Sequence, residues 1–375
     1  MAQYAHVTGW GMTTPEKVLT NFELEQMVDT NDEWIVSRTG IRERHIASSH
    51  ETTSSLAVDA ARRALSLTTL DPSDIQLIIV ATASPDYIFP ATACLVQDQL
   101  GAINAGAFDL SAACTGFIYA LNMAAQSIRS GSLDNAVVIG SETLSRFVNY
   151  DDRDTCVLFG DGAGAFVLQA SDKPGGVLSC VMRSDGSGSD LLSIPAGGST
   201  IPATHETVDR KLHAIQMNGR EVFRFATRVM ASATKEAVDQ AGLRLEDIKL
   251  VVPHQANSRI IEAAARGIQM PMSQIVMNIE RYGNTSTASI PIAICEALDE
   301  DKINPGDHLV LVGFGGGLSW GALVLEWSEP ETRRVSPGLR RRRRLLVFLA
   351  RLRSFGLRLL RKLEGLIWGA SSTEE

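Results

Sequence analysis

Short apolar segments alternate with amphipathic segments along most of this chain. Four of them are short, apolar and rich in β-branched residues, as buried strands are: 76–81, 136–140, 249–252 and 309–313. Between them apolar residues recur at helical spacing, which predicts helices at 54–67, 116–130, 222–241 and 290–298. Gly131 and Gly242 stand where a glycine commonly ends a helix. The alternation predicts an α/β fold with mainly parallel sheets and helices on their faces.

The pattern also repeats within the chain. Residues 74–78 (DIQLI) resemble 247–251 (DIKLV), and strands end at Gly140 and Gly313, so both pairs show the same offset of 173 (247 minus 74, 313 minus 140). The glycine-rich segments 159–165 and 314–317 are offset by only 155, which leaves about 18 extra residues near 142–158 in the first half. We therefore expect two similar halves, 1–170 and 171–330, with the insertion forming substrate or dimer loops.

Cys114 is the first candidate for chemistry. It follows an expected strand at 105–110 and precedes an expected helix that begins near Gly116. A thiol at a helix N-terminus lies beside unpaired N–H groups and the positive end of the helix dipole, which favour the thiolate and lower the pKa. The same N–H groups can bind an oxyanion. Packing is the alternative role, and we assign it to the other four cysteines, Cys94, Cys156, Cys180 and Cys295.

Two further polar residues lie where ligands commonly bind. His254 follows the strand 249–252, and the ends of strands are where open α/β sheets bind ligands. Asn284 lies in a polar turn before an apolar helix, where it also fits a structural role as a cap. Its offset from Cys114 is 170 (284 minus 114), which is close to the repeat interval. We expect the two residues at equivalent points of the two halves, facing each other.

Other kinds of site find less support in the sequence. The segment 313–317 (GFGGG) matches neither a dinucleotide fingerprint nor a P-loop, and reads as a tight turn that could bring an N–H close to a reacting carbonyl. The five cysteines show no CxxC pair, so we expect neither a disulfide framework nor a metal site. The first residues do not resemble an export signal, which favours the cytoplasm.

Charge is distributed unevenly along the chain. The 375 residues are 45% hydrophobic and carry a net charge of −8. The segment 331–375 holds 12 basic and 4 acidic groups, a net +8, so the rest of the chain, 1–330, carries −16 (−8 minus +8). An acidic body disfavours nucleic-acid binding, which requires a positive surface.

Six motifs occur in order: 32–41 (DEWIVSRTGI), 112–117 (AACTGF), 159–164 (FGDGAG), 254–257 (HQAN), 283–286 (GNTS) and 315–317 (GGG). Together they resemble β-ketoacyl-acyl-carrier-protein synthase III, the initiating condensing enzyme of bacterial fatty-acid synthesis, across about residues 1–328. The resemblance implies the thiolase fold, in which two duplicated mixed-sheet halves form five αβαβα layers. It also implies a homodimer without a cofactor.

The resemblance further implies a decarboxylative Claisen condensation. Cys114 would accept an acyl group from acyl-CoA, most simply acetyl-CoA, as a thioester. Malonyl-acyl carrier protein would then lose CO₂, and its carbanion would attack the acyl group. His254 and Asn284 would stabilise the enolate, and the N–H groups of Cys114 and Gly316 would form the oxyanion hole at the acyl carbonyl.

Binding residues are implied in the same way. Trp34, Arg38 and Arg153 match positions that hold coenzyme A. Phe89 matches a residue that reaches the acyl tunnel of the neighbouring subunit and limits chain length. Five arginines in an otherwise acidic body would dock the acidic carrier protein: Arg220, Arg224 and Arg228 on one helix face, and Arg259 and Arg266 on the helix after His254. A solvated surface is the alternative for all five.

Residues 331–375 continue beyond the family pattern. Leu345, Phe348, Leu349, Leu352, Leu359, Leu363 and Ile367 share one helical face, and Arg344, Arg351 and Arg358 lie off it. The segment resembles a basic amphipathic helix that is too polar to span a membrane. We expect peripheral contact with an anionic membrane through 340–368. Self-association, docking of carrier protein and a disordered tail are alternatives.

Three other functions are alternatives to the initiation of fatty-acid synthesis. A related condensing enzyme of specialised metabolism would share the mechanism but use another acyl donor or acceptor. A catalytically silent scaffold recruited through the C-terminal helix would not need Cys114, His254 and Asn284 together. A Cys/His metal module would need ligand spacings that the sequence lacks.

Overall fold

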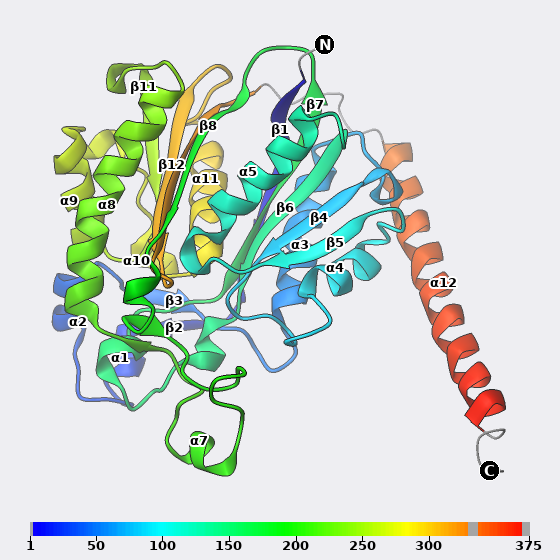
Figure 1. Cartoon of the computed structure of the whole chain (residues 1–375), viewed down its shortest axis with the longest axis horizontal. Coiled ribbons are helices and arrows are strands. Elements are labelled where there is room, and N and C mark those ends of the chain that lie inside the picture. The colour runs from blue at the N-terminus through cyan, green and yellow to red at the C-terminus, as the bar shows by residue number, and fades with distance from the viewer. Residues whose placement is uncertain (1–2, 329–336, 370–375) are drawn as a thin grey trace.

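The computed structural model describes residues 3–328 and 337–369, and two β-sheets organise the first of these ranges (Figure 1). The first sheet has the strand order β1 (Tyr4–Thr13), β7 (Gly162–Ser171), β6 (Asn135–Glu142), β4 (Leu77–Ala81) and β5 (Gly106–Leu110). The second has the order β11 (Ile248–Pro253), β12 (His308–Gly315), β13 (Ser319–Glu326) and β8 (Gly176–Ser184). Two small pairs complete the strands: β2 (Val18–Thr20) with β3 (Glu43–His45), and β9 (Leu192–Ser193) with β10 (Gln216–Met217).

The long helices form three layers around these sheets, so that the body has five layers (Figure 1). Helices α3 (Thr53–Ser66) and α4 (Thr92–Leu100) cover the outer face of the first sheet. Helices α5 (Gly116–Arg129) and α11 (Ser289–Asp299) lie between the sheets, and α8 (Gly219–Gln240) and α9 (Ser258–Ile268) cover the second. The shorter helices are α1 (Asn21–Leu24), α2 (Asp32–Thr39), α6 (Arg153–Cys156), α7 (His205–Asp209) and α10 (Ile279–Tyr282).

The strands and helices expected from the hydrophobic pattern are confirmed, with ends that differ by a few residues. Gly131 and Gly242 follow α5 and α8 with φ of 76° and 71°, the left-handed conformation that glycine adopts without strain. The expectation of mainly parallel sheets is wrong, because both sheets are mixed. Strands β4–β5, β4–β6 and β11–β12 are parallel, whereas β7 and β13 pair antiparallel with both of their neighbours. Neither β6–β7 nor β12–β13 is joined by a crossover helix, so the chain reverses direction there.

The repeat interval found in the sequence is visible in the secondary structure. Strands β6 and β12 are both 8 residues long and begin at Asn135 and His308, which reproduces the interval (308 minus 135). The 3₁₀ turns η2 (Ala113–Thr115) and η7 (Ser286–Ala288), which precede α5 and α11, are separated by the same interval (286 minus 113). The expected insertion lies between β6 and β7, where η3 (Leu144–Phe147) and α6 replace the short turn between β12 and β13.

Apolar side chains fill the space between layers. The largest cluster lies between the two sheets, where Phe117 of α5 meets Phe166 of β7 edge to face with 5.2 Å between ring centroids. Because most residues of α5 and α11 are buried in this layer, the turns that precede these helices are held in place by close packing.

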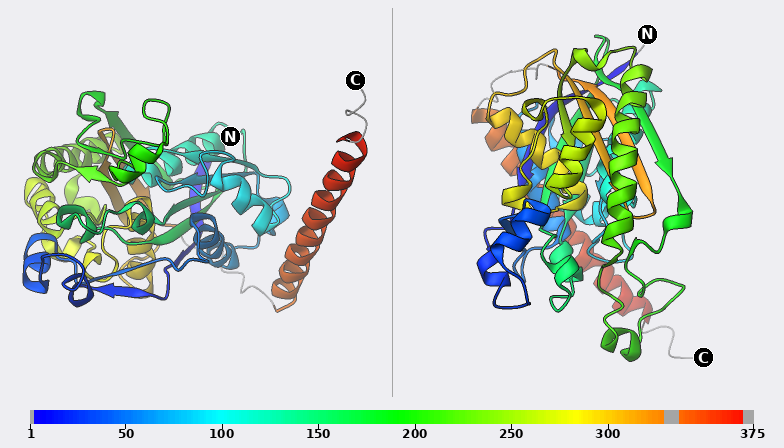
Figure 2. Two further views of the ribbon diagram at one scale, coloured as in Figure 1. Left: turned by 90° about the horizontal axis from the view of Figure 1, so that it is seen from below. Right: turned by 90° about the vertical axis from the view of Figure 1, so that its left-hand side faces the viewer.

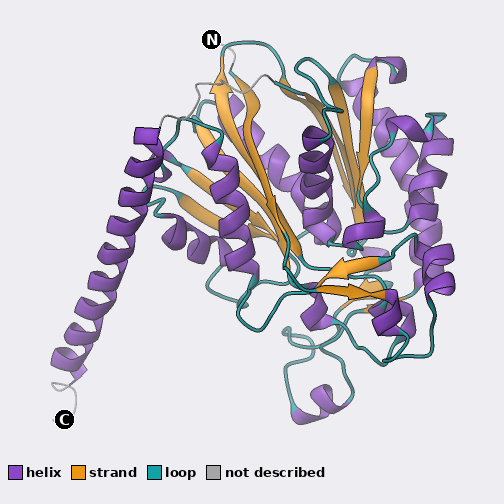
Figure 3. Cartoon of the chain, turned by 180° about the vertical axis from the view of Figure 1, so that it is seen from behind, coloured by secondary structure: helices purple, strands orange, loops and turns teal. Residues whose placement is uncertain are grey.

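Helix α12 (Pro337–Gly369) stands outside the five layers. It runs beside α4 and the 3₁₀ turn η1 (Pro72–Asp74), and its C-terminal end points away from the body (Figure 2). The view from behind shows the same arrangement (Figure 3). None of the described helices is long and apolar enough to cross a membrane.

Candidate active site

Cys114 lies in the turn η2, between the end of β5 and the first residue of α5. Ala113, immediately before it, has φ of 45°, an uncommon conformation for a residue with a side chain. The strained turn places Cys114 at the N-terminus of α5 as expected, with 7% of its surface exposed.

The surroundings of the thiol differ from the expectation of a lowered pKa. Burial raises the pKa of Cys114 to about 12, and the nearby Glu142 carboxylate acts in the same direction. The Ser286 hydroxyl, with its Oγ 3.3 Å from Cys114 Sγ, opposes these effects only in part. Desolvation of the buried sulfur outweighs the effect of the helix dipole, which favours the thiolate. The resting thiol is therefore protonated at neutral pH and needs a base.

Glycine is required beside Cys114 by the closeness of the backbones. A Cβ placed on Gly315, at the end of β12, would lie 2.7 Å from the backbone N of Cys114. Gly313 of the same strand lies beside His254, where an added Cβ would come into contact with the histidine Cβ at 3.4 Å. The glycine-rich segment thus brings the second half of the chain against the nucleophile turn.

His254 follows β11 and is 1% exposed. Its Nδ1 lies 2.7 Å from Ser289 Oγ, and Ser289 Oγ also lies 2.8 Å from the carbonyl oxygen of Ser286. Burial lowers the pKa of His254 to about 3, so the imidazole is neutral at physiological pH. A neutral imidazole fixed at Nδ1 presents Nε2 as its reactive atom.

Asn284 is held in the turn before α11. Its Oδ1 accepts a hydrogen bond of 2.9 Å from the Ser286 N–H, and its backbone bonds to Leu158 and Gly160 of the first half. With Oδ1 occupied, the Nδ2 group is the donor that the side chain can offer to a ligand. Asn284 is 7% exposed, as Cys114 is.

The two turns are equivalent, but the residue that corresponds to Cys114 is Thr287. The repeat interval relates Ala113 to Ser286, and these two residues share a positive φ of 45° and 48°. Asn284 lies three positions before Thr287, because its offset from Cys114 is 170 and the repeat interval is 173. The expectation that Cys114 and Asn284 lie in equivalent turns is therefore correct, but they do not occupy the same position within those turns.

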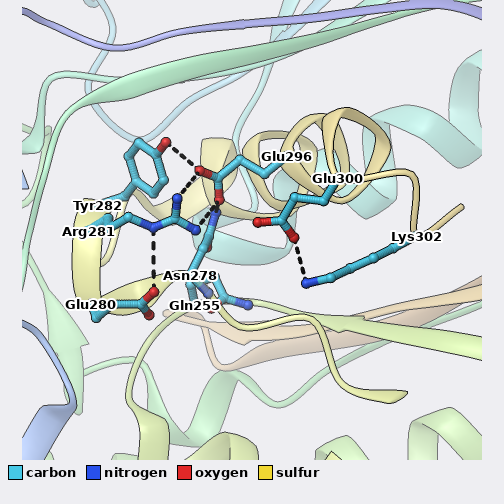
Figure 4. A network of polar contacts seen from close by, with 8 residues as sticks. All are labelled: Gln255, Asn278, Glu280, Arg281, Tyr282, Glu296, Glu300 and Lys302. Atoms are coloured by element: carbon cyan, nitrogen blue, oxygen red, sulfur yellow. Dashed lines mark hydrogen bonds and ion pairs between the residues drawn. The ribbon is translucent and has the colours of Figure 1, made fainter. Parts of the chain in front are cut away.

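A polar network supports the elements that carry His254 and Asn284 (Figure 4). Gln255 Oε1 accepts from the Asn278 N–H at 3.0 Å, and the Asn278 side chain donates to Glu296 of α11 at 2.6 Å. Tyr282, two residues before Asn284, donates to the same carboxylate at 2.6 Å, and Arg281 forms an ion pair with it at 2.9 Å. The network joins the loop after β11 to α10 and α11.

Two cavities meet at Cys114. The larger, about 1150 Å³, is lined by Cys114, His254 and Asn284 and extends to Trp34, Arg38 and Asn257. The smaller, about 600 Å³, is mostly apolar and is lined by Cys114, Ser286, Gly316, Leu192 and other residues of both halves. The predicted catalytic residues are therefore brought together, and Gly316 lies with Cys114 on the smaller cavity.

The predicted coenzyme A residues form a cluster at the outer part of the larger cavity. The guanidinium carbons of Arg38 and Arg153 lie 5.2 Å and 4.9 Å from the centroid of the Trp34 ring, in cation–π geometry. Arg153 belongs to α6, so the insertion between β6 and β7 contributes to this cluster.

The predicted docking arginines divide into two groups. Arg220, Arg224 and Arg259 line the larger cavity, whereas Arg228 and Arg266 are exposed but do not line it. Phe89 is 85% exposed, and Ile88 beside it is equally exposed. It lines neither cavity of its own chain.

Three residues of the site were missed in the sequence. Ser286, Ser289 and Glu142 contact or orient the predicted residues, but serines in a turn and one glutamate in a strand carry no local signal. The repeat interval would have indicated Ser286, because it matches the residue before Cys114. Across residues 3–328 and 337–369, no three His, Cys, Asp or Glu side chains gather as a metal site, and all five cysteines are free thiols.

The chain is similar to known proteins over most of its length. Residues 108–186 match the family model described as 3-oxoacyl-[acyl-carrier-protein (ACP)] synthase III, and residues 238–327 match the model of its C-terminal part. The chain is 52% identical over 328 residues to the β-ketoacyl-[acyl-carrier-protein] synthase III of Roseiflexus sp. (strain RS-1), which covers 88% of this chain and 100% of that protein. It is 56% identical over 323 residues to the enzyme of the same name from Symbiobacterium thermophilum, covering 86% of this chain and 98% of that protein.

A solved structure gives the same result for the fold. The crystal structure of 3-oxoacyl-[acyl-carrier-protein] synthase III from Aquifex aeolicus VF5 superposes with a TM-score of 0.80 at 47% identity, covering 86% of this chain and 100% of that chain. The thiolase fold implied by the six motifs is confirmed. Sequence and fold agree in assigning the chain to the β-ketoacyl-acyl-carrier-protein synthase III family of condensing acyltransferases.

Proposed function

We propose that this chain initiates fatty-acid synthesis by condensing an acyl-CoA, with acetyl-CoA as the starter, with malonyl-acyl carrier protein. One observation carries the proposal: Cys114, His254 and Asn284 line a single cavity that runs outward to Trp34 and Arg38. This cavity offers a nucleophile and donors at its inner end and a cationic, aromatic site for a nucleotide at its outer end.

Acylation requires that the Cys114 proton be removed. When Ser289 donates to the Ser286 carbonyl, its Oγ accepts from His254 Nδ1–H, and Nε2 carries a lone pair. In this tautomer Nε2 takes the thiol proton as Sγ attacks the acyl carbonyl, and passes it to the sulfur of departing coenzyme A. The products are the acyl-cysteine and neutral coenzyme A thiol, with His254 returned to its starting state.

Condensation uses the other tautomer. When Ser289 donates to Nδ1 instead, Nε2–H becomes a donor beside Asn284 Nδ2. The two donors stabilise the enolate oxygen that forms as the malonyl thioester loses CO₂. The enolate carbon attacks the acyl carbonyl, and the thioester bond between that carbonyl carbon and Cys114 Sγ breaks to give the 3-oxoacyl product. The released thiolate takes up a proton from water, which restores the resting thiol. The N–H groups of Cys114 and Gly316 hold the oxyanion of that step.

We also propose that each half of the chain supplies a different set of site residues. The half 1–170 supplies Cys114, Trp34, Arg38 and Arg153, and the half 171–330 supplies His254, Asn284 and Gly316. Arg220, Arg224, Arg228, Arg259 and Arg266 dock the acidic carrier protein. Their positions on α8 and α9, at and beyond the mouth of the larger cavity, support this role.

The test is the intact mass of the protein after incubation with acetyl-CoA. An acetyl adduct on the wild-type chain, absent from Cys114→Ala and retained by Cys94→Ala, is the expected result. Adding malonyl-acyl carrier protein should then remove the adduct and produce a 3-oxoacyl carrier protein. A wild-type chain without an adduct from any of a panel of acyl-CoAs would contradict the proposal.

The chain is further proposed to act as a homodimer. Strand β5 is an edge strand of the first sheet, where its one partner among the described strands is β4, and the apolar side chains of Ile88 and Phe89 are exposed. Phe89 would enter the acyl cavity of the neighbouring subunit. We expect a solution mass twice the chain mass of 40.5 kDa, and acceptance of longer acyl-CoAs by Phe89→Ala. A monomeric mass at assay concentration would exclude this arrangement.

A last part of the proposal is peripheral contact with the cytoplasmic face of a membrane through residues 340–368. The alignment with the Roseiflexus protein covers 88% of this chain, and the family model ends at residue 327, so α12 is an addition to the shared fold. Sedimentation with vesicles compares the whole chain with a chain ending at residue 328. Equal pelleting of the two would argue against the contact.

A further inference from the structure

Helix α12 has two sides with opposite properties. Large apolar side chains at spacings of three and four, each about half exposed, form an outer stripe: Leu345, Phe348, Leu349, Leu352, Phe355, Leu359, Leu360 and Leu363. The inner stripe faces the body and contains the small or partly covered side chains of Val347, Ala350 and Ser354, together with Arg343. The predicted positions Ile367, Arg344 and Arg351 lie outside the described side chains. The helix therefore turns most of its large apolar side chains away from the protein.

The N-terminal part of α12 is attached at the end of α3. Arg343 donates to the carbonyl oxygens of Leu65 and Thr68 at 2.9 and 2.6 Å, which places a cation at a helix C-terminus. The Asp71 carboxylate, on a residue that is 3% exposed, lies 3.0 Å from the guanidinium of Arg342 and 3.7 Å from that of Arg343. A nearly buried carboxylate thus finds its cations in α12.

A second attachment lies about three turns further along. Ser354 and Arg358 both bond to the carboxylate of Asp98 in α4. Between the two attachments Ala350 lies against Gly101, where an added Cβ would come within 2.9 Å of the alanine Cβ. Two separate anchors fix the rotation of α12 about its own axis, so the outer stripe has a defined direction.

The net charge of α12 indicates which kind of partner binds its outer stripe. The segment 337–369 carries ten basic residues and one acidic residue, a net +9, attached to a body of −16. Packing two copies stripe to stripe would bring two such charges within the Debye length of about 10 Å. An anionic bilayer accepts both properties at once, since apolar side chains enter the acyl region while arginines meet the headgroups. The stripe is also straight and about 27 Å long from Leu345 to Leu363, which suits a flat surface.

We infer that α12 is a pre-docked anchor whose inner arginines hold it to Asp71 and Asp98 and whose outer stripe binds the surface of a bilayer rich in anionic lipid. The inference rests on the membrane contact proposed above and adds the lipid class and the orientation. It leaves the condensation chemistry untouched, so the two can fail separately.

The test is co-sedimentation of the full chain with phosphatidylcholine vesicles, with and without about 30% phosphatidylglycerol. We expect at least about tenfold tighter binding to the anionic vesicles, and loss of this binding in Phe348→Glu/Leu352→Glu. The matched control is Val208→Glu/Met272→Glu, which adds the same charge at exposed apolar positions of the body. Acetylation of Cys114 by acetyl-CoA should be unchanged in both variants.

Two results would overturn the inference about the stripe. The first is equal binding to neutral and anionic vesicles, or unchanged binding of the stripe variant. The second is vesicle-independent self-association of the wild-type chain that the stripe variant loses, which would make a second copy the occupant.

The attachment is tested separately by Asp71→Asn/Asp98→Asn. Without vesicles, amides of residues 343–358 should exchange hydrogen at least about tenfold faster in this variant, because the helix is freed from the body. Unchanged exchange would show that these carboxylates do not hold α12.

A second inference concerns Glu142, which is fully buried at the end of β6. Its carboxylate accepts hydrogen bonds from the hydroxyls of Thr82, Ser84 and Thr287 and from the Ala83 N–H. Among the described residues none of its contacts is an ion pair with a base. All of its partners are therefore dipoles that fix its position.

The repeat shows what Glu142 corresponds to. The repeat interval relates Glu142 to Gly315 and Thr287 to Cys114. The contact between Glu142 and Thr287, 3.0 Å from Oε1 to Oγ1, is the counterpart of the close approach of Gly315 to Cys114. In one half glycine lets the backbone of β12 approach the Cys114 turn closely. In the other half the Glu142 side chain bonds to the equivalent turn through Thr287.

From this equivalence we infer that Glu142 is a positioning residue, which holds the turn 284–288 through Thr287 and thereby aims the Asn284 amide. Thr287 Oγ1 also lies 2.9 Å from the carbonyl oxygen of Ala81, so the turn is fastened to the ends of both β4 and β6. Loss of this support moves Asn284 directly, whereas it reaches Cys114, which is carried by the other turn, only through the Ser286 hydroxyl.

The test separates the two half-reactions. Thr287→Val should slow decarboxylation of malonyl-acyl carrier protein at least about tenfold while acetylation of Cys114 changes less than about twofold. Glu142→Ala should show the same selective loss, because it removes the acceptor of the Thr287 hydroxyl. Equal slowing of both steps in either variant would overturn the inference.

Discussion

The nucleophile turn and helix α12 distribute polar and apolar groups in opposite ways. Around Cys114 the polar side chains of His254, Ser289 and Glu142 are buried and hydrogen-bonded to one another or to the backbone. On α12 Arg343 and Ser354 bond to the body, whereas most of the large apolar side chains face solvent. A buried polar network fixes geometry, whereas an exposed apolar stripe requires a partner.

The comparison predicts that the two regions respond independently to substitution. Changes in the turn should alter chemistry without altering vesicle binding, and changes in the stripe should do the reverse. A substitution in one region that changes the property of the other would contradict this independence.

The largest effect is expected from Cys114→Ala. Removal of the nucleophile should lower the rate of condensation by at least about 10³-fold, because no acyl-enzyme can form. The rate of 3-oxoacyl carrier protein formation measures this, and vesicle binding should equal that of the wild type. Weaker vesicle binding in this variant would show that the two regions are coupled.

Asn284→Ala should have the next largest effect. Loss of the Nδ2 donor should slow decarboxylation by about 10²- to 10³-fold, as removal of one oxyanion-hole donor does. Release of CO₂ from labelled malonyl-acyl carrier protein measures the step, and Asn304→Ala, on the surface near β12, is a suitable control. A loss of acetylation equal to the loss of decarboxylation would contradict the assigned role.

The burial of Cys114 predicts a pH dependence of its reactivity. Because the pKa of Cys114 is raised to about 12, the thiolate fraction should rise about tenfold per pH unit through the neutral range. Alkylation by iodoacetamide should therefore be about 100-fold faster at about pH 9 than at about pH 7, without a plateau between them. A plateau near neutral pH would show that the helix dipole outweighs desolvation.

The smallest effect is expected where α12 meets α4. The Arg358 side chain is 68% exposed in its ion pair with Asp98, so Asp98→Asn alone should change the free energy of unfolding by less than about 1 kcal/mol. Denaturant unfolding measures this, with Asp59→Asn, in the exposed pair with Arg62, as the control. A larger loss than in that control would show that α12 contributes to the stability of the body.

The sequence was informative wherever a local pattern decides the structure. The strand ending at Gly140 and the helix ending before Gly131 are set by short apolar runs and by glycine conformations, which neighbouring residues reveal. The candidate site residues Cys114, His254 and Asn284 could be selected because each follows a strand or precedes a helix within a motif. The repeat also indicated the insertion between β6 and β7.

Features that depend on distant segments were not predictable in this way. The direction of β7 depends on what joins it to β6, and the pKa of Cys114 depends on burial by residues of both halves. Nothing near Glu142 in the sequence points to Thr287. The apolar stripe of α12 was visible in the sequence, but its attachment to Asp71 and Asp98 was not, because the arginines could equally have faced water.

The contact between Ala350 and Gly101 sets a condition for transplanting the C-terminal helix. Gly101 ends α4 with φ of 78°, and any side chain there would strike Ala350 as well as strain the backbone. If the segment 329–375 were fused to a relative, we expect its helix to pack against the body only where that relative has glycine at the position of Gly101. It would also need carboxylates at the positions of Asp71 and Asp98. On a body without these residues the same segment would be attached only through the chain. Gly101, Asp71 and Asp98 therefore make the body of this enzyme complementary to its C-terminal helix.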